Sequence, residues 1–105
     1  MKFHVQELRP EVLAFALLME ARLREKDADK GGSWKGMTAS ALFTPFLSKA
    51  FAVEKGIFHG KMPYTEHAID VANYAMMIAD VSGALDTTEG NGGPGWEALD
   101  QVQMA

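Results

Sequence analysis

The sequence predicts an all-α protein, a bundle of three to four helices that oligomerisation completes. Apolar residues recur at intervals of three and four in three separate segments, and residues that favour helix ends bound each segment. No segment has the strict apolar–polar alternation of a half-buried strand. The chain has 105 residues, of which 48% are hydrophobic and 23% are charged, as expected for one small folded domain.

The first helix is expected to begin at Pro10, because proline suits the first turn of a helix. Positive charge accumulates toward the other end, where the helix dipole favours it, and Gly31 should lie beyond the last turn. The apolar stripe of this helix consists of Val12, Phe15, Met19 and Leu23, and Leu13 and Leu17 widen it.

The second helix is expected to start with Thr38 or Ser40 as its cap and to end at Gly56. Pro45 lies inside this span and should kink the helix or divide it into two pieces. The predicted apolar side of the helix consists of Leu47, Ala50, Phe51 and Val53.

The third helix is expected to start with Thr65 as its cap and to end around Gly83. It is apolar around almost its whole circumference, and such a helix is normally buried. It could pack against the first helix as an antiparallel pair. Because three or four short helices bury little area, we expect a homodimer or homotetramer to cover the remaining apolar surface.

The chain consists of two regions that differ in composition. Residues 1–85 contain the predicted helices and are assigned to a helical bundle core. Residues 86–105 are assigned to a Gly-rich linker, which contains Asn91-Gly92-Gly93-Pro94, and a short C-terminal helix or tail.

The composition argues against several classes of protein. With 10 basic and 14 acidic residues the formal net charge is −4 and no basic patch is visible, so nucleic acid is not an expected partner. The absence of cysteine excludes disulfides and thiolate metal sites. No apolar run reaches the length of about 18 residues that indicates a membrane span. Since the N-terminus also lacks the apolar core of a signal peptide, we expect a cytoplasmic protein.

A narrow acidic stripe follows one side of the third helix. Glu66, Asp70, Asn73 and Asp80 fall within an arc of roughly 80° at about 100° per residue. Because a buried carboxylate needs a cation, a proton or hydrogen-bond donors, a divalent metal such as Mg²⁺ or Mn²⁺ is one expectation. The alternative is that Asp70 pairs with an arginine of the first helix, with Glu66 exposed at the start of the third.

The loop from Lys30 to Lys35 is a second candidate site. Its glycines would let backbone N–H groups approach an anion, the lysines add positive charge, and Trp34 can stack on a nucleobase. The loop lacks the spacing of a P-loop, and Gly-Gly pairs are also common in plain connections between helices. Both interpretations of the loop stay open.

Two segments of the chain carry a family resemblance. The segment Asp70–Asp80 resembles the second metal-binding helix of the MazG-like all-α nucleoside triphosphate pyrophosphohydrolases, in particular their small phage-type members. Leu17–Asp27, followed by Lys30-Gly31-Gly32-Ser33-Trp34, is similar to the helix and loop that open those proteins. The resemblance implies an oligomeric bundle that binds Mg²⁺ through a Glu-x-x-Glu pair and a later Glu-x-x-Asp pair. It also implies hydrolysis of a nucleoside triphosphate to the monophosphate and pyrophosphate.

The metal-binding pattern of that family is incomplete in this chain. Asp70 matches the last acidic ligand, but His67 stands where a Glu is expected, and Glu66 lies one residue out of register. In the second helix only Glu54 can take an acidic position of the first pair, and the other position of that pair is apolar.

Two functions are therefore expected as alternatives. The first is Mg²⁺-dependent nucleotide pyrophosphohydrolysis, and the second is a non-catalytic nucleotide-binding or protein-interaction module on the same fold. For hydrolysis, the expected catalytic and metal-binding residues are Glu54, Glu66 and Asp70. The expected substrate-binding residues are Lys30, Trp34, Lys35 and Asn73.

Overall fold

A computed structural model describes residues 4–28, 31–60 and 64–85, and these ranges form helices without any strand. This finding confirms the predicted all-α class. The predicted linker and tail, residues 86–105, lie outside the described residues. The elements are the 3₁₀ helix η1 (Val5–Glu7), α1 (Pro10–Lys26), the 3₁₀ helix η2 (Ser33–Gly36), α2 (Ala39–His59) and α3 (Tyr64–Val81).

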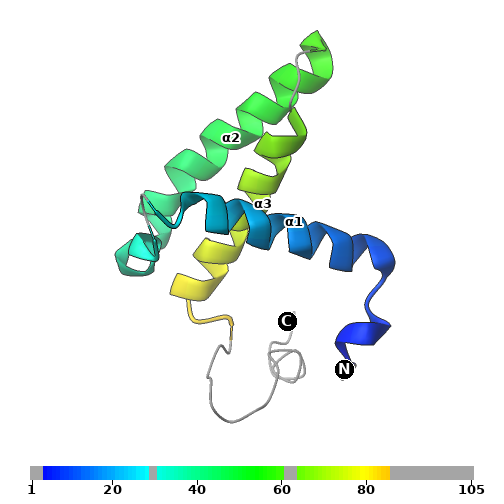
Figure 1. The fold of residues 1–105 in the computed structure, drawn as a ribbon. Coiled ribbons are helices and arrows are strands. Elements are labelled where there is room, and N and C mark those ends of the chain that lie inside the picture. Colours follow the sequence, from blue (N-terminus) through cyan, green and yellow to red (C-terminus); the bar gives the residue numbers. More distant parts are fainter. Residues whose placement is uncertain (1–3, 29–30, 61–63, 86–105) are drawn as a thin grey trace.

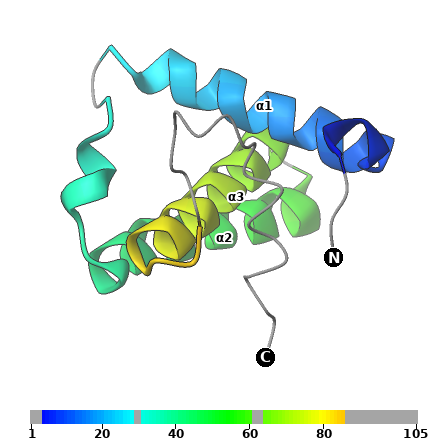
Figure 2. The same cartoon turned by 90° about the horizontal axis from the view of Figure 1, so that it is seen from below.

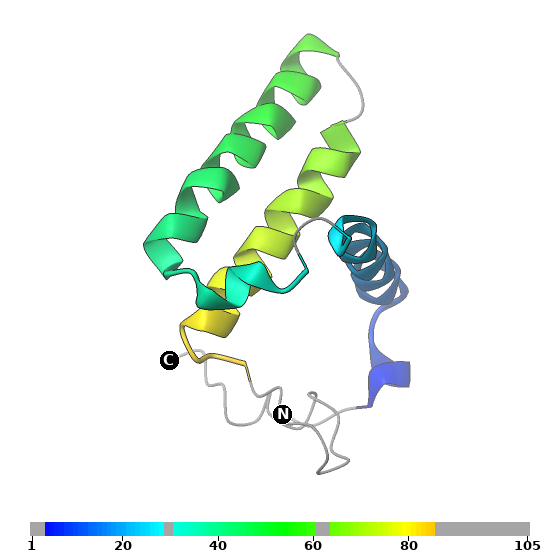
Figure 3. The ribbon, with the colours of Figure 1, turned by 60° about the vertical axis from the view of Figure 1, so that its left-hand side comes forward.

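The helix α3 lies at the centre of the fold. It runs antiparallel to α2, its neighbour along the chain, and the two pack side by side (Figures 1 and 3). The helix α1 crosses α3 on the side away from α2, so that α3 lies between them (Figure 2). The antiparallel partner of α3 is thus α2, and the expected antiparallel pairing of the first and third helices is wrong.

The helix α1 begins at Pro10, as predicted, and ends at Lys26. Although the structure describes every residue of α1, none of them is buried. Met19 is half-buried at the crossing with α3, whereas Val12 and Phe15 are 50% and 38% exposed. The N-terminal half of α1 extends past α3 (Figure 1), which leaves that part of its predicted apolar stripe uncovered.

The helix α2 begins after Thr38, whose hydroxyl oxygen accepts a hydrogen bond from the N–H of Ala41 at 3.1 Å, so the predicted cap is confirmed. The helix ends one turn later than predicted, at Gly60, where φ is 67°. Gly56 is buried inside α2 instead of ending it, because a glycine costs a helix only about 1 kcal/mol and packing outweighs that cost. Pro45 likewise lies inside one uninterrupted helix.

The face that α2 turns toward α3 differs from the predicted apolar side. Leu42, Lys49 and Gly56 recur every seven residues on this face, and Leu42 is completely buried. Leu47 and Phe51, which were expected to lie inside, are 39% and 56% exposed. Ala50 and Val53 are half-buried as predicted, whereas the prediction was wrong for Leu47 and Phe51. The reason is that the packing face contains a lysine and a glycine, which an apolar pattern does not identify.

The helix α3 begins at Tyr64, so Thr65 lies inside the first turn and is not the cap. Its buried residues are Asp70, Asn73 and Met77. The helix ends as predicted near Gly83, where φ is 82°. There the N–H of Ala84 donates to the carbonyl of Ala79 at 2.9 Å and closes the last turn, the pattern of a Schellman C-cap.

The core among the described residues is small. Leu42 and Met77 are its buried hydrophobic side chains, whereas Leu17, Phe51 and Phe58 are among the large apolar side chains that are more than half exposed. None of the helices described combines the length and the apolar composition needed to cross a bilayer.

Candidate functional site

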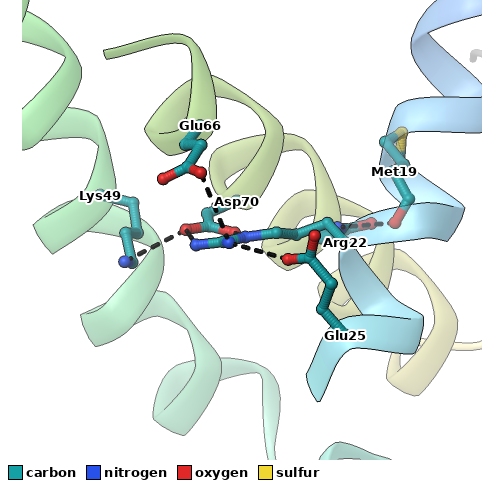
Figure 4. Close-up of polar contacts among 7 residues, drawn as sticks. Met19, Arg22, Glu25, Lys49, Glu66 and Asp70 are labelled. Carbon is teal, nitrogen blue, oxygen red and sulfur yellow. Dashed lines mark hydrogen bonds and ion pairs between the residues drawn. The ribbon is translucent and has the colours of Figure 1, made fainter. Parts of the chain in front are cut away.

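A buried carboxylate joins the three helices. Asp70 on α3 is 4% exposed, and Arg22 of α1 donates to both of its oxygens, from Nε to Oδ1 at 2.9 Å and from Nη2 to Oδ2 at 3.2 Å. Lys49 of α2 approaches from the other side, with Nζ 3.1 Å from Oδ2 (Figure 4). Asp70 therefore binds two cations of the chain itself.

The charges of this cluster keep Asp70 ionised. Burial raises the pKa of the Asp70 carboxyl, but the hydrogen bonds and the positive charges of Arg22 and Lys49 together lower it by more than burial raises it. The net effect is a pKa below the ordinary value of an aspartate. The hydrogen bond to Asp70 also raises the pKa of the Arg22 guanidinium.

Two more carboxylates surround Arg22 at the surface. Glu25 accepts a hydrogen bond from Nη1 of Arg22 at 3.1 Å, and Glu66 lies 4.0 Å from the same nitrogen. The side chains of Glu25 and Glu66 are 64% and 55% exposed, so solvent screens both contacts. The interpretation that Asp70 pairs with an arginine of the first helix and that Glu66 is exposed at the helix start agrees with this geometry.

Asn73 lies one turn further along α3 and holds the backbone of α1. Its Nδ2 donates to the carbonyl oxygen of Met19 at 3.2 Å, and the residue is 4% exposed. Its Oδ1 is buried and accepts no hydrogen bond from the described residues. Asn73, which was expected to contact a nucleoside, thus contributes to the attachment of α1 to α3.

Glu54 lies apart from this cluster. It is exposed on α2, five residues beyond Lys49, and five residues correspond to about 140° of rotation around a helix. Because Lys49 points at Asp70, Glu54 projects from a different side of α2. The structure does not bring Glu54 together with Glu66 and Asp70.

These residues do not fit a Mg²⁺ site. A hard divalent cation requires several free oxygen ligands, whereas both oxygens of Asp70 already contact Arg22 or Lys49. Within residues 4–28, 31–60 and 64–85, no group of three or more His, Asp or Glu side chains is arranged to hold a metal ion.

A pocket lies beside the cluster, where the end of α1, η2, the start of α2 and α3 meet. We call it the Trp34 pocket, and its volume is about 270 Å³. Its lining is mainly apolar and includes Trp34 and Tyr74, with Lys26 as its basic residue. The remaining lining residues are Leu23, Gly31, Ser33, Met37, Leu42, Pro45 and Met77.

The 3₁₀ helix η2, which forms one wall of this pocket, is attached to α3. Nζ of Lys35 lies 4.9 Å from the centre of the Trp34 ring and 3.3 Å from Oδ2 of Asp80 on α3. Lys35 therefore fixes η2 against α3, and its charge is already paired. Lys30, the other lysine expected to bind phosphate, lies outside the described residues.

Sequence reasoning missed the role of Lys49. The available signal was its position, because Leu42, Lys49 and Gly56 share one face of the second helix at intervals of seven residues. A lysine between two residues that are buried in a helix–helix contact needs an anionic partner, and the acidic stripe of the third helix supplies one. Comparison of the chain with protein-family models, with curated proteins and with solved structures found no match in any of the three.

Proposed function

We propose that this chain is a non-catalytic, MazG-like module that binds a nucleotide or a related phosphorylated small molecule in the Trp34 pocket. The observation that carries the proposal is the pocket itself, an apolar cavity between α1, η2, α2 and α3 with two aromatic side chains and one lysine in its lining. Small-molecule sites are typically concave and mainly apolar, with a few polar groups that orient the ligand.

The size and lining of the pocket favour a planar ring. Ligand pockets usually have volumes of about 300–1,000 Å³, so a pocket of about 270 Å³ suits one base better than a complete nucleotide. Trp34 and Tyr74 offer aromatic surfaces for stacking. Lys26 has no ion-pair partner among the described residues, and its ammonium group is available to a phosphate that remains outside the pocket.

The contacts of Asp70 favour binding over hydrolysis. The pyrophosphohydrolase alternative requires Mg²⁺ to be held by Glu54, Glu66 and Asp70, and these side chains do not converge. Asp70 instead binds Arg22 and Lys49. We therefore place the proposed ligand in the Trp34 pocket and assign no chemical step to the acidic stripe.

We further propose that the module is a homo-oligomer. This proposal rests on the small size of the core and on the many apolar side chains that are exposed among the described residues. They include Phe43, Leu47 and Phe51, which line an open groove on α2. Monomeric proteins rarely expose large contiguous apolar patches. Association of a second copy would remove this surface from water.

Isothermal titration with a panel of nucleoside triphosphates, monophosphates and nucleosides tests the ligand proposal. Base stacking on an aromatic side chain is worth about 1–3 kcal/mol, so Trp34→Ala should weaken binding about fivefold or more. Lys26→Ala should weaken the binding of phosphorylated ligands only. The control variant Lys55→Ala removes the same charge from α2 outside the pocket. It should change neither the affinity for phosphorylated ligands nor the affinity for nucleosides.

Two results would contradict the proposal. One is the absence of binding by any ligand of the panel at millimolar concentration, and the other is equal affinity of the wild type and Trp34→Ala. A parallel assay measures pyrophosphate release with Mg²⁺ or Mn²⁺. If the wild type releases pyrophosphate and Asp70→Asn does not, the pyrophosphohydrolase alternative is supported instead.

A further inference from the structure

Lys49 is the contribution of α2 to the ion cluster around Asp70, and none of the residues of this cluster lines the Trp34 pocket. It projects from the face of α2 that carries the buried Leu42 and Gly56, and its side chain is only 29% exposed. A lysine in such a position loses much of its hydration, which is unfavourable unless an anion compensates for it. Arg22 already forms two hydrogen bonds with Asp70, so Lys49 adds a second positive charge to one carboxylate.

We infer that the ammonium group of Lys49 occupies the place at which a divalent cation would otherwise bind Asp70. Nζ of Lys49 lies 3.1 Å from Oδ2, the oxygen that faces α2. Asp70 and Glu66 lie one turn apart on α3, and both contact Arg22, so a second carboxylate of α3 lies on the same side of the helix as Asp70. A cation site between α2 and α3 is thus closed by side chains of the chain itself.

The charges of the cluster explain why the ammonium group excludes a metal ion. A divalent cation at Oδ2 would meet Lys49 and Arg22 at short range, in surroundings where the low effective dielectric constant strengthens repulsion. The wild-type helix junction should therefore hold together without divalent metal. This inference does not depend on the proposed ligand, because neither Lys49 nor Asp70 lines the Trp34 pocket.

Charge reversal at Lys49 should open the site. Lys49→Glu removes the ammonium group and places a third carboxylate opposite Asp70 and Glu66, which together offer the oxygen ligands that Mg²⁺ and Mn²⁺ prefer. Without metal, these carboxylates repel one another and weaken the contact between α2 and α3. With metal, the same carboxylates become ligands, so the stability of the variant should depend on the divalent cation.

The experiment compares thermal unfolding midpoints in EDTA and in millimolar MnCl₂ for the wild type, Lys49→Glu and Lys55→Glu. Lys55→Glu is the matched control for the response to MnCl₂, because it makes the same charge change on α2 away from Asp70, at an exposed position of the apolar groove. In EDTA, Lys49→Glu should unfold about 5 °C or more below the wild type, and MnCl₂ should recover most of this loss. The midpoints of the wild type and of Lys55→Glu should not respond to MnCl₂.

A rise of the wild-type midpoint with MnCl₂ would overturn the inference, as would equal responses of Lys49→Glu and Lys55→Glu. If Lys49→Glu is unfolded under both conditions, the response of the unfolding midpoint to MnCl₂ is compared for Lys49→Gln and its control Lys55→Gln instead. Lys49→Gln leaves Oδ2 of Asp70 without an ammonium partner and must gain a response to MnCl₂ that Lys55→Gln lacks. Nucleotide binding in the Trp34 pocket can fail without affecting either result.

Discussion

Arg22 of α1 binds both carboxylate oxygens of Asp70 on α3, at 2.9 and 3.2 Å, across 48 residues of sequence. Because no residue of α1 is buried, apolar packing alone attaches this helix weakly. The bidentate contact and the hydrogen bond from Asn73 to the carbonyl of Met19 supply directional attachment instead. The position of α1 thus depends on a few polar contacts with the centre of α3.

Replacement of Asp70 by Asn should destabilise the protein strongly. The variant leaves Arg22 and Lys49 without their shared carboxylate while both remain partly buried, which should cost about 1–3 kcal/mol. Urea unfolding followed by circular dichroism measures the change. Glu54→Gln, at an exposed position of α2, should stay within about 0.5 kcal/mol of the wild type. Equal stabilities of the two variants would show that the ion cluster contributes nothing.

The contribution of Asp70 to stability should depend on pH. The pKa of its carboxyl is lower in the folded protein than its ordinary value of 3.8, so the folded state favours the ionised form. The stabilisation is fully present above the unfolded-state pKa and is lost as the pH falls through the folded-state pKa. The difference in unfolding free energy between wild type and Asp70→Asn should therefore stay constant from neutral pH to about pH 5. It should shrink below pH 3.8, and a difference that grows there would contradict the assignment.

Gly83 should resist substitution for a backbone reason. Its φ of 82° lies in the left-handed region, where an L-residue costs about 1–2 kcal/mol. An added Cβ would meet no heavy atom within 4 Å, so steric conflict with neighbours does not contribute. Gly83→Ala should therefore lower the unfolding free energy by about 1 kcal/mol. Gly36→Ala is the control, because Gly36 has open space around it and no positive φ, and it should be neutral or slightly stabilising.

The proposed self-association predicts an unfolding midpoint that rises with protein concentration. Size-exclusion chromatography with light scattering should give the mass of a dimer or larger species. Phe51→Glu, in the exposed apolar groove of α2, should shift this mass toward the monomer and lower the midpoint. Glu54→Gln should leave the mass unchanged. A monomeric mass for the wild type at every concentration would remove the proposal.

Local rules predicted the helices well and their packing faces poorly. Pro10 and Thr38 begin helices as predicted, because first-turn proline and hydroxyl capping depend on neighbouring backbone atoms only. Gly56 was expected to end the second helix and Pro45 to kink or divide it, yet both lie within the uninterrupted helix α2. The local cost is about 1 kcal/mol for the glycine and about 3 kcal/mol for the proline, and the packing of α2 against α3 outweighs it.

The sequence by itself determined the all-α class, most helix ends and the presence of a buried carboxylate on the third helix that needed a cation, a proton or hydrogen-bond donors. Only the tertiary structure decided which partner it has. Arg22 and Lys49 come from two other helices, and the crossing of α1 and the face of α2 bring them within hydrogen-bond distance of Asp70. Periodicity specifies which residues share a face, but the contact between faces depends on the free energy of the assembled helices, which no single segment contains.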